Sequence, residues 1–330
     1  MNPMWAVFFG WIASAWAGGE SQQNVVGGAP AATGAWPDVA AIYWGWSTGC
    51  TGVLIAPDLV LTAGHCYGGI TGVRLDSNND QHGGEFLDVV GEYEYPNSWN
   101  TVDIAVLVLG EASRVAPRII ARDCVLDSLV DGADVSVVGY GATDVWGNET
   151  TTTLMEGHTL VVDHDCSDLW AGCNGSVSPG GELQAGGGGV DACFGDSGGP
   201  LYLRTGQGDY LVGIVSRSIA DAWSPCGEAS VYGRPDFVIP WIEQVTGRTL
   251  PRPECGDGGG EDTGGNTGGA DQEGGDDGGT WNEEEEDANE PPLPTAEPIV
   301  VLEAVVTSTQ ITPNDPNPLD RHHFALVEVP

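Results

Sequence analysis

The sequence predicts an all-β fold over residues 25–250. Short runs of valine, isoleucine and leucine alternate there with breaks of glycine, proline and aspartate, for example in residues 51–56, 59–62, 104–109, 135–140 and 210–215. Short strands separated by turn residues are typical of an antiparallel sandwich or barrel. A convincing helix pattern comes only at the end of this region, and eight cysteines, an even number, indicate disulfides.

The chain begins with a predicted export signal, residues 1–17. Residues 4–16 are mostly apolar, and small residues stand at Ala15 and Ala17, where signal peptidase requires them. An uncleaved anchor is the alternative, but a bilayer span needs roughly 20 apolar residues, and this stretch is shorter. We therefore expect cleavage after Ala17, secretion and no membrane span. Residues 18–24 follow as a short polar lead.

The predicted helix begins near Pro240, since proline is favoured in a first helical turn. Trp241, Ile242 and Val245 form an apolar stripe, and Gly247 is suited to end the helix. We place the end of the folded domain at residue 252.

The composition changes after Arg252. Residues 253–297 form an acidic, glycine-rich stretch with almost nothing to bury, and this predicts a disordered linker. Residues 298–330 regain β-branched side chains, but about 35 residues are too few for a substantial core. The sequence assigns no role to this C-terminal segment.

The chain is strongly acidic, with 48 aspartates and glutamates against 10 basic residues, all of which are arginine. The net charge of −38 repels nucleic acid and anionic membranes, so neither is expected as a partner. The simplest interpretation of the charge is that it keeps an exported protein soluble.

A glycine-rich motif at residues 195–200, GDSGGP, is the strongest chemical signal. Acyl transfer needs an exposed hydroxyl and backbone N–H groups aimed at the developing oxyanion. Glycines on both sides of Ser197 allow the sharp turn that presents both. A glycine-rich surface turn is the alternative interpretation of this motif alone.

Two further motifs supply a base and an acid. His65 lies in residues 62–66, TAGHC, directly after an apolar strand, and histidine titrates in the range that a general base needs. Asp103 heads the apolar run of residues 103–107, DIAVL. A carboxylate there can accept the histidine N–H and fix its tautomer. Taken alone, the histidine beside Cys66 could instead be a metal ligand or a packing residue, although no CxxC or HxxxH pattern supports a metal. A lone aspartate before a strand is usually a turn residue.

Together, in the order His, Asp, Ser, these motifs resemble the trypsin–chymotrypsin family from Val25 to about Gly247. The resemblance implies two antiparallel Greek-key β-barrels with a C-terminal helix and a disordered tail, with the catalytic triad in the cleft between the barrels. It implies peptide-bond hydrolysis without a cofactor, in which Ser197 is the nucleophile, His65 the general base and acid, and Asp103 the orienting carboxylate.

The resemblance also assigns supporting roles. The N–H groups of Gly195 and Ser197 would form the oxyanion hole, and Ser216 would support the buried Asp103.

The start of the domain resembles the mature N-terminus of the family. The resemblance implies that cleavage before Val25 frees an α-amino group, which pairs with Asp196 and orders the oxyanion loop. The preceding residue is Asn24 rather than a basic residue. A second protease that cuts after Asn24 is therefore expected as a partner.

The resemblance also bears on substrate choice. Asp191 would lie at the base of the specificity pocket and favour arginine or lysine substrates. Ser218 and Ser230 stand at wall positions that are usually glycine, and Arg217 stands where the family usually has tryptophan. These departures leave a serine endopeptidase of another specificity as an open alternative. Arg217 competing for Asp191 is one way that this would arise.

The cysteines agree with the family in part. The resemblance implies the bridges Cys50–Cys66 and Cys193–Cys226. Cys166 resembles half of a third family bridge whose usual partner position is Gln184, so Cys166–Cys173 is a local substitute. The two cysteines that are left, Cys124 and Cys255, are assigned to each other. Both of these last two pairs are hypotheses, because eight cysteines permit many pairings.

Cofactor signals are weak. Oxygen ligands in residues 76–85 (Asp76, Asn78, Asn79, Asp80 and Glu85) lie near a loop that binds calcium in some relatives, but a solvated loop fits their spacing better. Residues 163–165, DHD, are interpreted as an exposed polar turn rather than a metal site. The expected partners are protein or peptide substrates of a monomeric enzyme. A catalytically silent secreted binding module is the alternative from another functional class.

Overall fold

The computed structural model describes residues 25–255. The predicted signal peptide, the lead and the segments after residue 255 lie outside the described residues. Within them, strands β1 to β13 precede the helix α1. Strand β1 is short (Ala29–Pro30). No helix in this range has the length and apolar character that a bilayer crossing requires.

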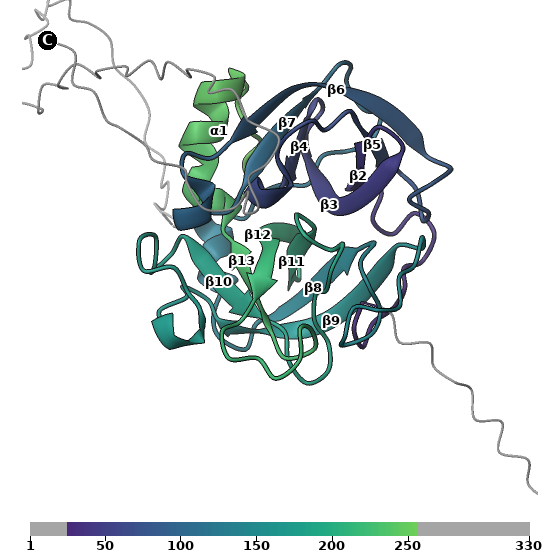
Figure 1. Cartoon of the computed structure of the whole chain (residues 1–330). Helices are drawn as coiled ribbons and strands as arrows, with labels where there is room; N and C mark the ends of the chain where they lie inside the picture. Colours follow the sequence, from purple (N-terminus) through teal and green to yellow (C-terminus); the bar gives the residue numbers. More distant parts are fainter. Residues whose placement is uncertain (1–24, 256–330) are drawn as a thin grey trace, which may run out of the picture. The chain divides into compact units, whose positions relative to one another are not determined.

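The first barrel contains six antiparallel strands and is closed in the order β2-β3-β4-β7-β6-β5 (Figure 1). They are β2 (Val39–Trp44), β3 (Ser47–Ala56), β4 (Leu59–Thr62), β5 (Gly72–Leu75), β6 (Glu85–Glu94) and β7 (Ala105–Leu109).

Strands β4 and β7 are almost continuously apolar because both of their faces are buried. Leu59 and Leu61 belong to a core cluster shared with the second barrel, whereas Val60 and Leu107 belong to the interior of the first. Successive side chains of a strand point to opposite faces, so a strand buried on both sides shows no polar alternation.

The second barrel has the order β9-β10-β13-β12-β11-β8, and pairing of β8 with β9 closes it, while β1 adds to the edge of β9. Its strands are β8 (Asp134–Gly139), β9 (Met155–Asp163), β10 (Glu182–Ala185), β11 (Pro200–Thr205), β12 (Gly208–Ser218) and β13 (Ser230–Gly233). The predicted class, all-β with two antiparallel barrels and a terminal helix, is confirmed.

Short 3-10 helices lie in the connections. They are η1 (Gly64–Cys66), η2 (Ser98–Asn100), η3 (Asp123–Ser128), η4 (Leu169–Ala171) and η5 (Pro235–Val238). Helix α1 (Ile239–Thr246) has proline in its first turn and ends at Gly247 in the left-handed conformation. Its Ile239 and Ile242 enter the shared core cluster, so the helix packs onto the barrels through the apolar stripe that the sequence predicts.

A buried ion pair joins the two barrels. Arg118, in the connection between them, donates to both carboxylate oxygens of Asp38 at 3.0 and 2.7 Å. Tyr202 of β11 donates to the same carboxylate at 2.6 Å, and the guanidinium lies 4.6 Å from the centroid of the Tyr202 ring. Because three separate segments share one set of contacts, the barrels are held in a fixed orientation around the cleft.

The described residues contain four disulfides: Cys50–Cys66, Cys124–Cys255, Cys166–Cys173 and Cys193–Cys226. They are the four pairs expected from the sequence. The pair Cys124–Cys255 spans 131 residues and ties η3, in the connection between the barrels, to the segment after α1.

Candidate active site

Strand register brings His65 beside Asp103. Strands β4 and β7 pair antiparallel, with Thr62 opposite Ala105. The end of one strand therefore lies beside the start of the other. His65 comes three residues after Thr62 and Asp103 two residues before Ala105, so the two side chains meet at one end of the first barrel.

His65 and Asp103 are joined by two hydrogen bonds. His65 Nδ1 lies 2.8 Å from Oδ2 of Asp103, and the His65 backbone N–H donates to Oδ1 at 2.8 Å. Ser216 donates to Oδ2 at 2.7 Å. Burial raises the pKa of the Asp103 carboxyl, but these hydrogen bonds outweigh burial and hold the pKa below its usual value. Asp103 is therefore ionised and orients the imidazole.

The turn around Ser197 depends on its glycines. Gly198 has φ +80°, and a Cβ there would lie 2.1 Å from Oγ1 of Thr62 and 2.4 Å from the carbonyl oxygen of Thr51. A side chain at position 198 would therefore separate the loop from the first barrel. The Thr51 N–H donates to the Ser197 carbonyl at 2.8 Å, which anchors the loop across the cleft.

The backbone N–H groups of Gly195 and Ser197 have no acceptor among residues 25–255. Gly195 has φ +99°, and a Cβ there would lie 2.9 Å from Gly141 Cα. The loop thus keeps two amide donors available beside Ser197, an arrangement suited to binding an oxyanion.

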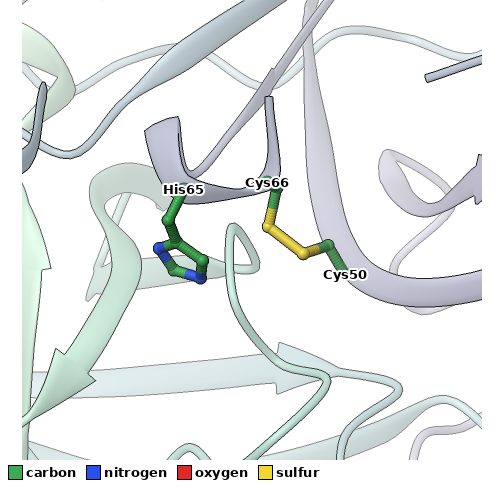
Figure 2. Close-up of side chains that lie close together, drawn as sticks. All are labelled: Cys50, His65 and Cys66. Carbon is green, nitrogen blue, oxygen red and sulfur yellow. A yellow bond between two sulfur atoms is a disulfide. The ribbon is translucent and has the colours of Figure 1, made fainter. Parts of the chain in front are cut away.

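Ser197 and His65 line one cleft of about 300 Å³. The structure has no hydrogen bond between the Ser197 hydroxyl and the His65 ring. This contact is often long in free enzymes and shortens when substrate binds. In Figure 2 the His65 ring lies beside the Cys50–Cys66 disulfide, and one of its ring nitrogens is within 4.8 Å of both sulfur atoms. Because that bridge occupies both sulfur atoms, the three residues are no metal ligand set.

The predicted specificity pocket does not expose its acidic residue to the cleft. Asp191 is fully buried and accepts hydrogen bonds from Ser230 Oγ (2.8 Å), Gly227 N (3.0 Å) and Ala192 N (2.8 Å). Burial raises its pKa to about 6. Ser230 lines the cleft and Asp191 does not, so the serine separates the carboxylate from the cleft.

Arg217 does not contact Asp191, so the predicted competition between them is absent. Its guanidinium instead forms a bidentate ion pair with Glu182 of β10, at 2.7 and 3.0 Å. Glu182 was not among the predicted site residues, because it lies 35 residues before Arg217 and no local sequence pattern connects the two.

The start of the domain is docked into the second barrel. Val25 and Val26 are buried, and the Val26 carbonyl accepts a hydrogen bond from Asp191 N at 3.1 Å. A Cβ at Gly27, where φ is +76°, would lie 2.0 Å from the Gly189 carbonyl oxygen, which explains the glycine. Asp196 is also buried, and the N–H groups of Gly141 and Cys193 donate to it at 2.8 and 2.9 Å.

Asp196 forms no ion pair within residues 25–255. Burial raises its pKa to about 7. In the uncut chain Val25 carries a peptide bond rather than a free α-amino group. The carboxylate therefore stands without the cationic partner that the predicted activation would supply.

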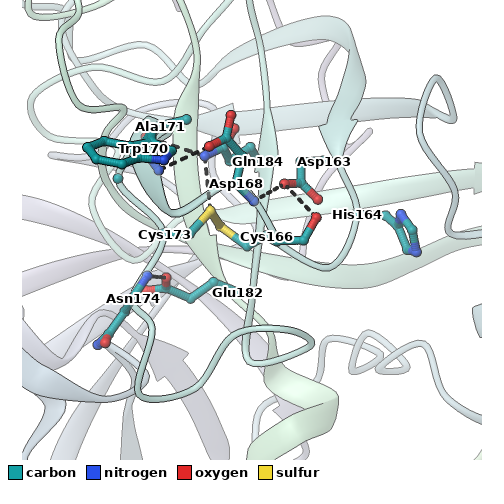
Figure 3. The surroundings of a disulfide bond; sticks show 12 residues. Asp163, His164, Cys166, Asp168, Trp170, Ala171, Cys173, Asn174, Glu182 and Gln184 are labelled. Atoms are coloured by element: carbon teal, nitrogen blue, oxygen red, sulfur yellow. Dashed lines mark hydrogen bonds between the residues drawn. A yellow bond between two sulfur atoms is a disulfide. The ribbon is translucent and has the colours of Figure 1, made fainter.

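The surroundings of Cys166–Cys173 explain the local substitution (Figure 3). Gln184, at the position where the family has the partner cysteine, donates to Cys173 Sγ at 3.1 Å and to the Ala171 carbonyl at 3.3 Å. The side chain at this position is thus still linked to the bridge, by hydrogen bonds.

Three side chains of the weak calcium candidate are engaged in contacts with the protein, whereas Oδ1 of the buried Asp80 has no hydrogen-bond partner among the described residues. Asn78 bonds Ala31 and Gly34, Asn79 bonds Thr152, and Glu85 accepts from Ser113 and Arg114. Asp163 and His164 do lie near a third acid, Asp131, which the sequence analysis missed. His164 Nδ1 is 2.8 Å from the Asp131 carboxylate.

Comparison with known proteins agrees with this geometry. A family model described as Trypsin matches residues 25–242. Glucanase inhibitor protein 3 from Phytophthora infestans is 34% identical over an alignment of 215 residues, and the match covers 60% of this chain and 78% of that protein. Coagulation factor XII from Sus scrofa is 31% identical over an alignment of 252 residues, and the match covers 68% of this chain but only 40% of that protein.

A likeness to a solved structure concerns the fold alone. HL collagenase is 24% identical, with a TM-score of 0.58, and the match covers 68% of this chain and 99% of that one.

Proposed function

Because the chain belongs to the trypsin family, we propose that it is a secreted serine endopeptidase that hydrolyses peptide bonds through an acyl-enzyme. The observation that carries the proposal is the hydrogen-bonded set Ser216–Asp103–His65, which lies at the cleft that Ser197 also lines. These residues come from both barrels and meet only in the folded chain.

The chemistry follows from these positions. Ser197 Oγ attacks the carbonyl carbon while His65 takes its proton, and Asp103 stabilises the resulting imidazolium. The N–H groups of Gly195 and Ser197 bind the oxyanion. His65 then gives the proton to the leaving amine, and water repeats the sequence on the acyl-enzyme. No step needs a cofactor.

Activation is proposed to occur by cleavage between Asn24 and Val25. The new α-ammonium group would pair with Asp196, which is buried without a cation in the uncut chain. A buried carboxylate is favourable only with such a partner. Another protease makes the cut, because the family's basic residue is missing at position 24. We further propose a signal peptide at 1–17, a propeptide at 18–24, a protease domain at 25–252 and a monomeric enzyme.

Cleavage after arginine or lysine is proposed from the Asp191 carboxylate at the base of the pocket. A second candidate, an endopeptidase of non-basic specificity, is favoured by one observation. Ser230 occupies Oδ1 of Asp191 and lines the cleft in its place. The serine must move aside, or share its hydrogen bond, before a guanidinium can reach the carboxylate.

A peptide library tests both specificities. Protein that begins at Val25 is incubated with mixed peptides beside a Ser197→Ala control. Cuts after arginine and lysine that are absent from the control support the primary proposal. Cuts after other residues support the second candidate and retain the mechanism.

A catalytically silent binding module is the candidate from another class. One relative carries the name of an inhibitor rather than a peptidase, which favours testing this idea. Reaction of Ser197 with a fluorophosphonate, in protein that begins at Val25, separates the classes, since a non-catalytic module would leave Ser197 unlabelled. Deleting residues 256–330 and measuring the same labelling tests whether the C-terminal segment serves catalysis.

A further inference from the structure

Arg217 extends the hydrogen-bonded set of the triad. Its Nη1 donates to Ser216 Oγ at 3.2 Å, and Ser216 Oγ donates its proton to Asp103 at 2.7 Å. Asp103 is in turn 2.8 Å from His65 Nδ1. The Ser216 oxygen accepts the hydrogen bond from Arg217, so the single hydroxyl proton is directed to the other side, toward Asp103.

Glu182 holds Arg217 in place. The Glu182 side chain is fully buried, and it accepts two hydrogen bonds from the guanidinium and one from Asn174 N at 2.7 Å (Figure 3 shows the contact with Asn174). Arg217 also donates to the Gly172 carbonyl at 2.8 Å. Bidentate pairs fix both distance and plane, so the guanidinium has one orientation.

We propose that Arg217, held in place by Glu182, is a positioning residue for the triad. It orients the Ser216 hydroxyl toward Asp103, and its charge, balanced by that of Glu182, determines how readily His65 is protonated. The proposal rests on the proposed serine peptidase function for its effect on catalysis. Arg217 touches neither substrate nor reacting atoms in this role; it acts through Ser216.

The signs of the expected effects follow from the charges. Glu182→Gln leaves the Arg217 cation unbalanced behind Asp103, and a nearby cation disfavours a protonated His65. Arg217→Gln leaves the Glu182 carboxylate unbalanced and frees the Ser216 hydroxyl to rotate, and both changes favour a protonated His65. The two single variants therefore move the protonation of His65 in opposite directions. The double variant restores the balance.

Other titratable groups surround this set. On β6, Glu94 accepts a hydrogen bond from Ser98 of η2. On β13, burial raises the pKa of Tyr232 far above the working range. Behind the pocket wall, Asp191 has its pKa raised to about 6 and titrates within the range of interest. Readouts that do not depend on a basic substrate side chain are therefore needed.

The test measures the His65 imidazole directly. Protein that carries Ser197→Ala and isotope-labelled histidine is titrated with pH and followed by NMR. The His65 signal is identified as the one that disappears in a His65→Gln variant. We expect the midpoint to fall by about 0.5 pH unit in Glu182→Gln and to rise by about the same amount in Arg217→Gln. The double variant, which leaves no buried charge unpaired, is expected to titrate within about 0.2 unit of the parent. Arg204→Gln, at an exposed arginine of β11, is the matched control.

The same variants with Ser197 intact show the catalytic consequence. The rate of fluorophosphonate labelling is expected to shift along the pH axis in the same two directions. Unchanged midpoints in both single variants, or shifts of the same sign, would overturn the proposal. All labelling uses protein that begins at Val25. A parent of this form that titrates as expected but never labels would instead refute the proposed function, since the NMR midpoint does not depend on turnover.

Discussion

Ser230 Oγ donates a 2.8 Å hydrogen bond to Oδ1 of Asp191, and the serine, not the carboxylate, lines the cleft. The hydroxymethyl group therefore stands between a substrate side chain and the charge proposed to recognise it.

Replacing Ser230 by glycine should strengthen basic specificity. Ser230→Gly opens the carboxylate to the cleft, and a guanidinium gains a charge-assisted hydrogen bond. We expect kcat/KM to rise about tenfold for peptides cleaved after arginine, which corresponds to about 1.4 kcal/mol of transition-state stabilisation. For peptides cleaved after other residues we expect little change in kcat/KM. The same change combined with Asp191→Asn is the control, and an equal gain in that double variant would contradict the prediction.

The pH dependence of stability should distinguish the uncut from the cut chain. Burial raises the pKa of Asp196 to about 7 in the folded uncut chain, from the usual value of 3.8. Between these values the folded state binds more protons than the unfolded state, so the free energy of unfolding falls as pH rises. For Ser197→Ala protein with residues 1–24 or 18–24 retained, we expect a fall of about 2 kcal/mol between pH 5 and 7 from this group.

In protein that begins at Val25, the α-ammonium group should keep Asp196 ionised, and this part of the slope should vanish. Urea titrations at each pH measure both proteins. The contribution of Asp191 is common to the two, because its raised pKa has the same cause in each. Identical slopes would argue against pairing of the new N-terminus with Asp196.

A methyl group at position 198 should damage the site. In Gly198→Ala the new Cβ meets Thr62 and Thr51 within 2.4 Å, and φ of +80° disfavours alanine. We expect a loss of about 3 kcal/mol in the free energy of unfolding and little fluorophosphonate labelling. Gly206→Ala is the matched control, because nothing lies within 4 Å of its Cβ, and it should stay within about 0.5 kcal/mol of the parent.

The two non-family disulfides should contribute unequally to stability. Cys166–Cys173 closes a loop with a separation of 7 residues, whereas Cys124–Cys255 closes one of 131. Loop-closure entropy predicts losses of about 2.5 kcal/mol for the double serine variant of the first pair and about 5 kcal/mol for the second. Denaturant unfolding measures both, and a larger loss for the short loop would show that native contacts, such as those of Gln184, outweigh chain entropy.

Much of the fold is visible in the sequence because local patterns encode it. The short apolar runs become strands, and Pro240 and Gly247 bound the helix. The resemblance to the trypsin–chymotrypsin family, carried by the three motifs, implies that His65 and Asp103 meet. Other contacts arise only from strand register and have no local signal. Glu182 at the start of β10 carries no mark of its bidentate pair with Arg217. Likewise, nothing in residues 163–165 points to Asp131.

One open alternative from the resemblance is not realised in the structure. It was that Arg217, at a position where the family usually has tryptophan, competes for Asp191. In the folded chain the guanidinium pairs with the buried Glu182 of β10, while Asp191 accepts hydrogen bonds from Ser230 and from backbone N–H groups.

The bridge between Cys124 and Cys255 changes what a proteolytic cut can release. A nick between Gly247 and Cys255 would break the main chain, yet everything from Cys255 onward would remain covalently joined to the connection between the barrels through Cys124. Shedding of the acidic C-terminal region therefore needs either a cut beyond residue 255 or reduction of this one bond. The disulfide keeps residues 25–247 and the segment that begins at Cys255 in one covalent unit even after a cut at that site.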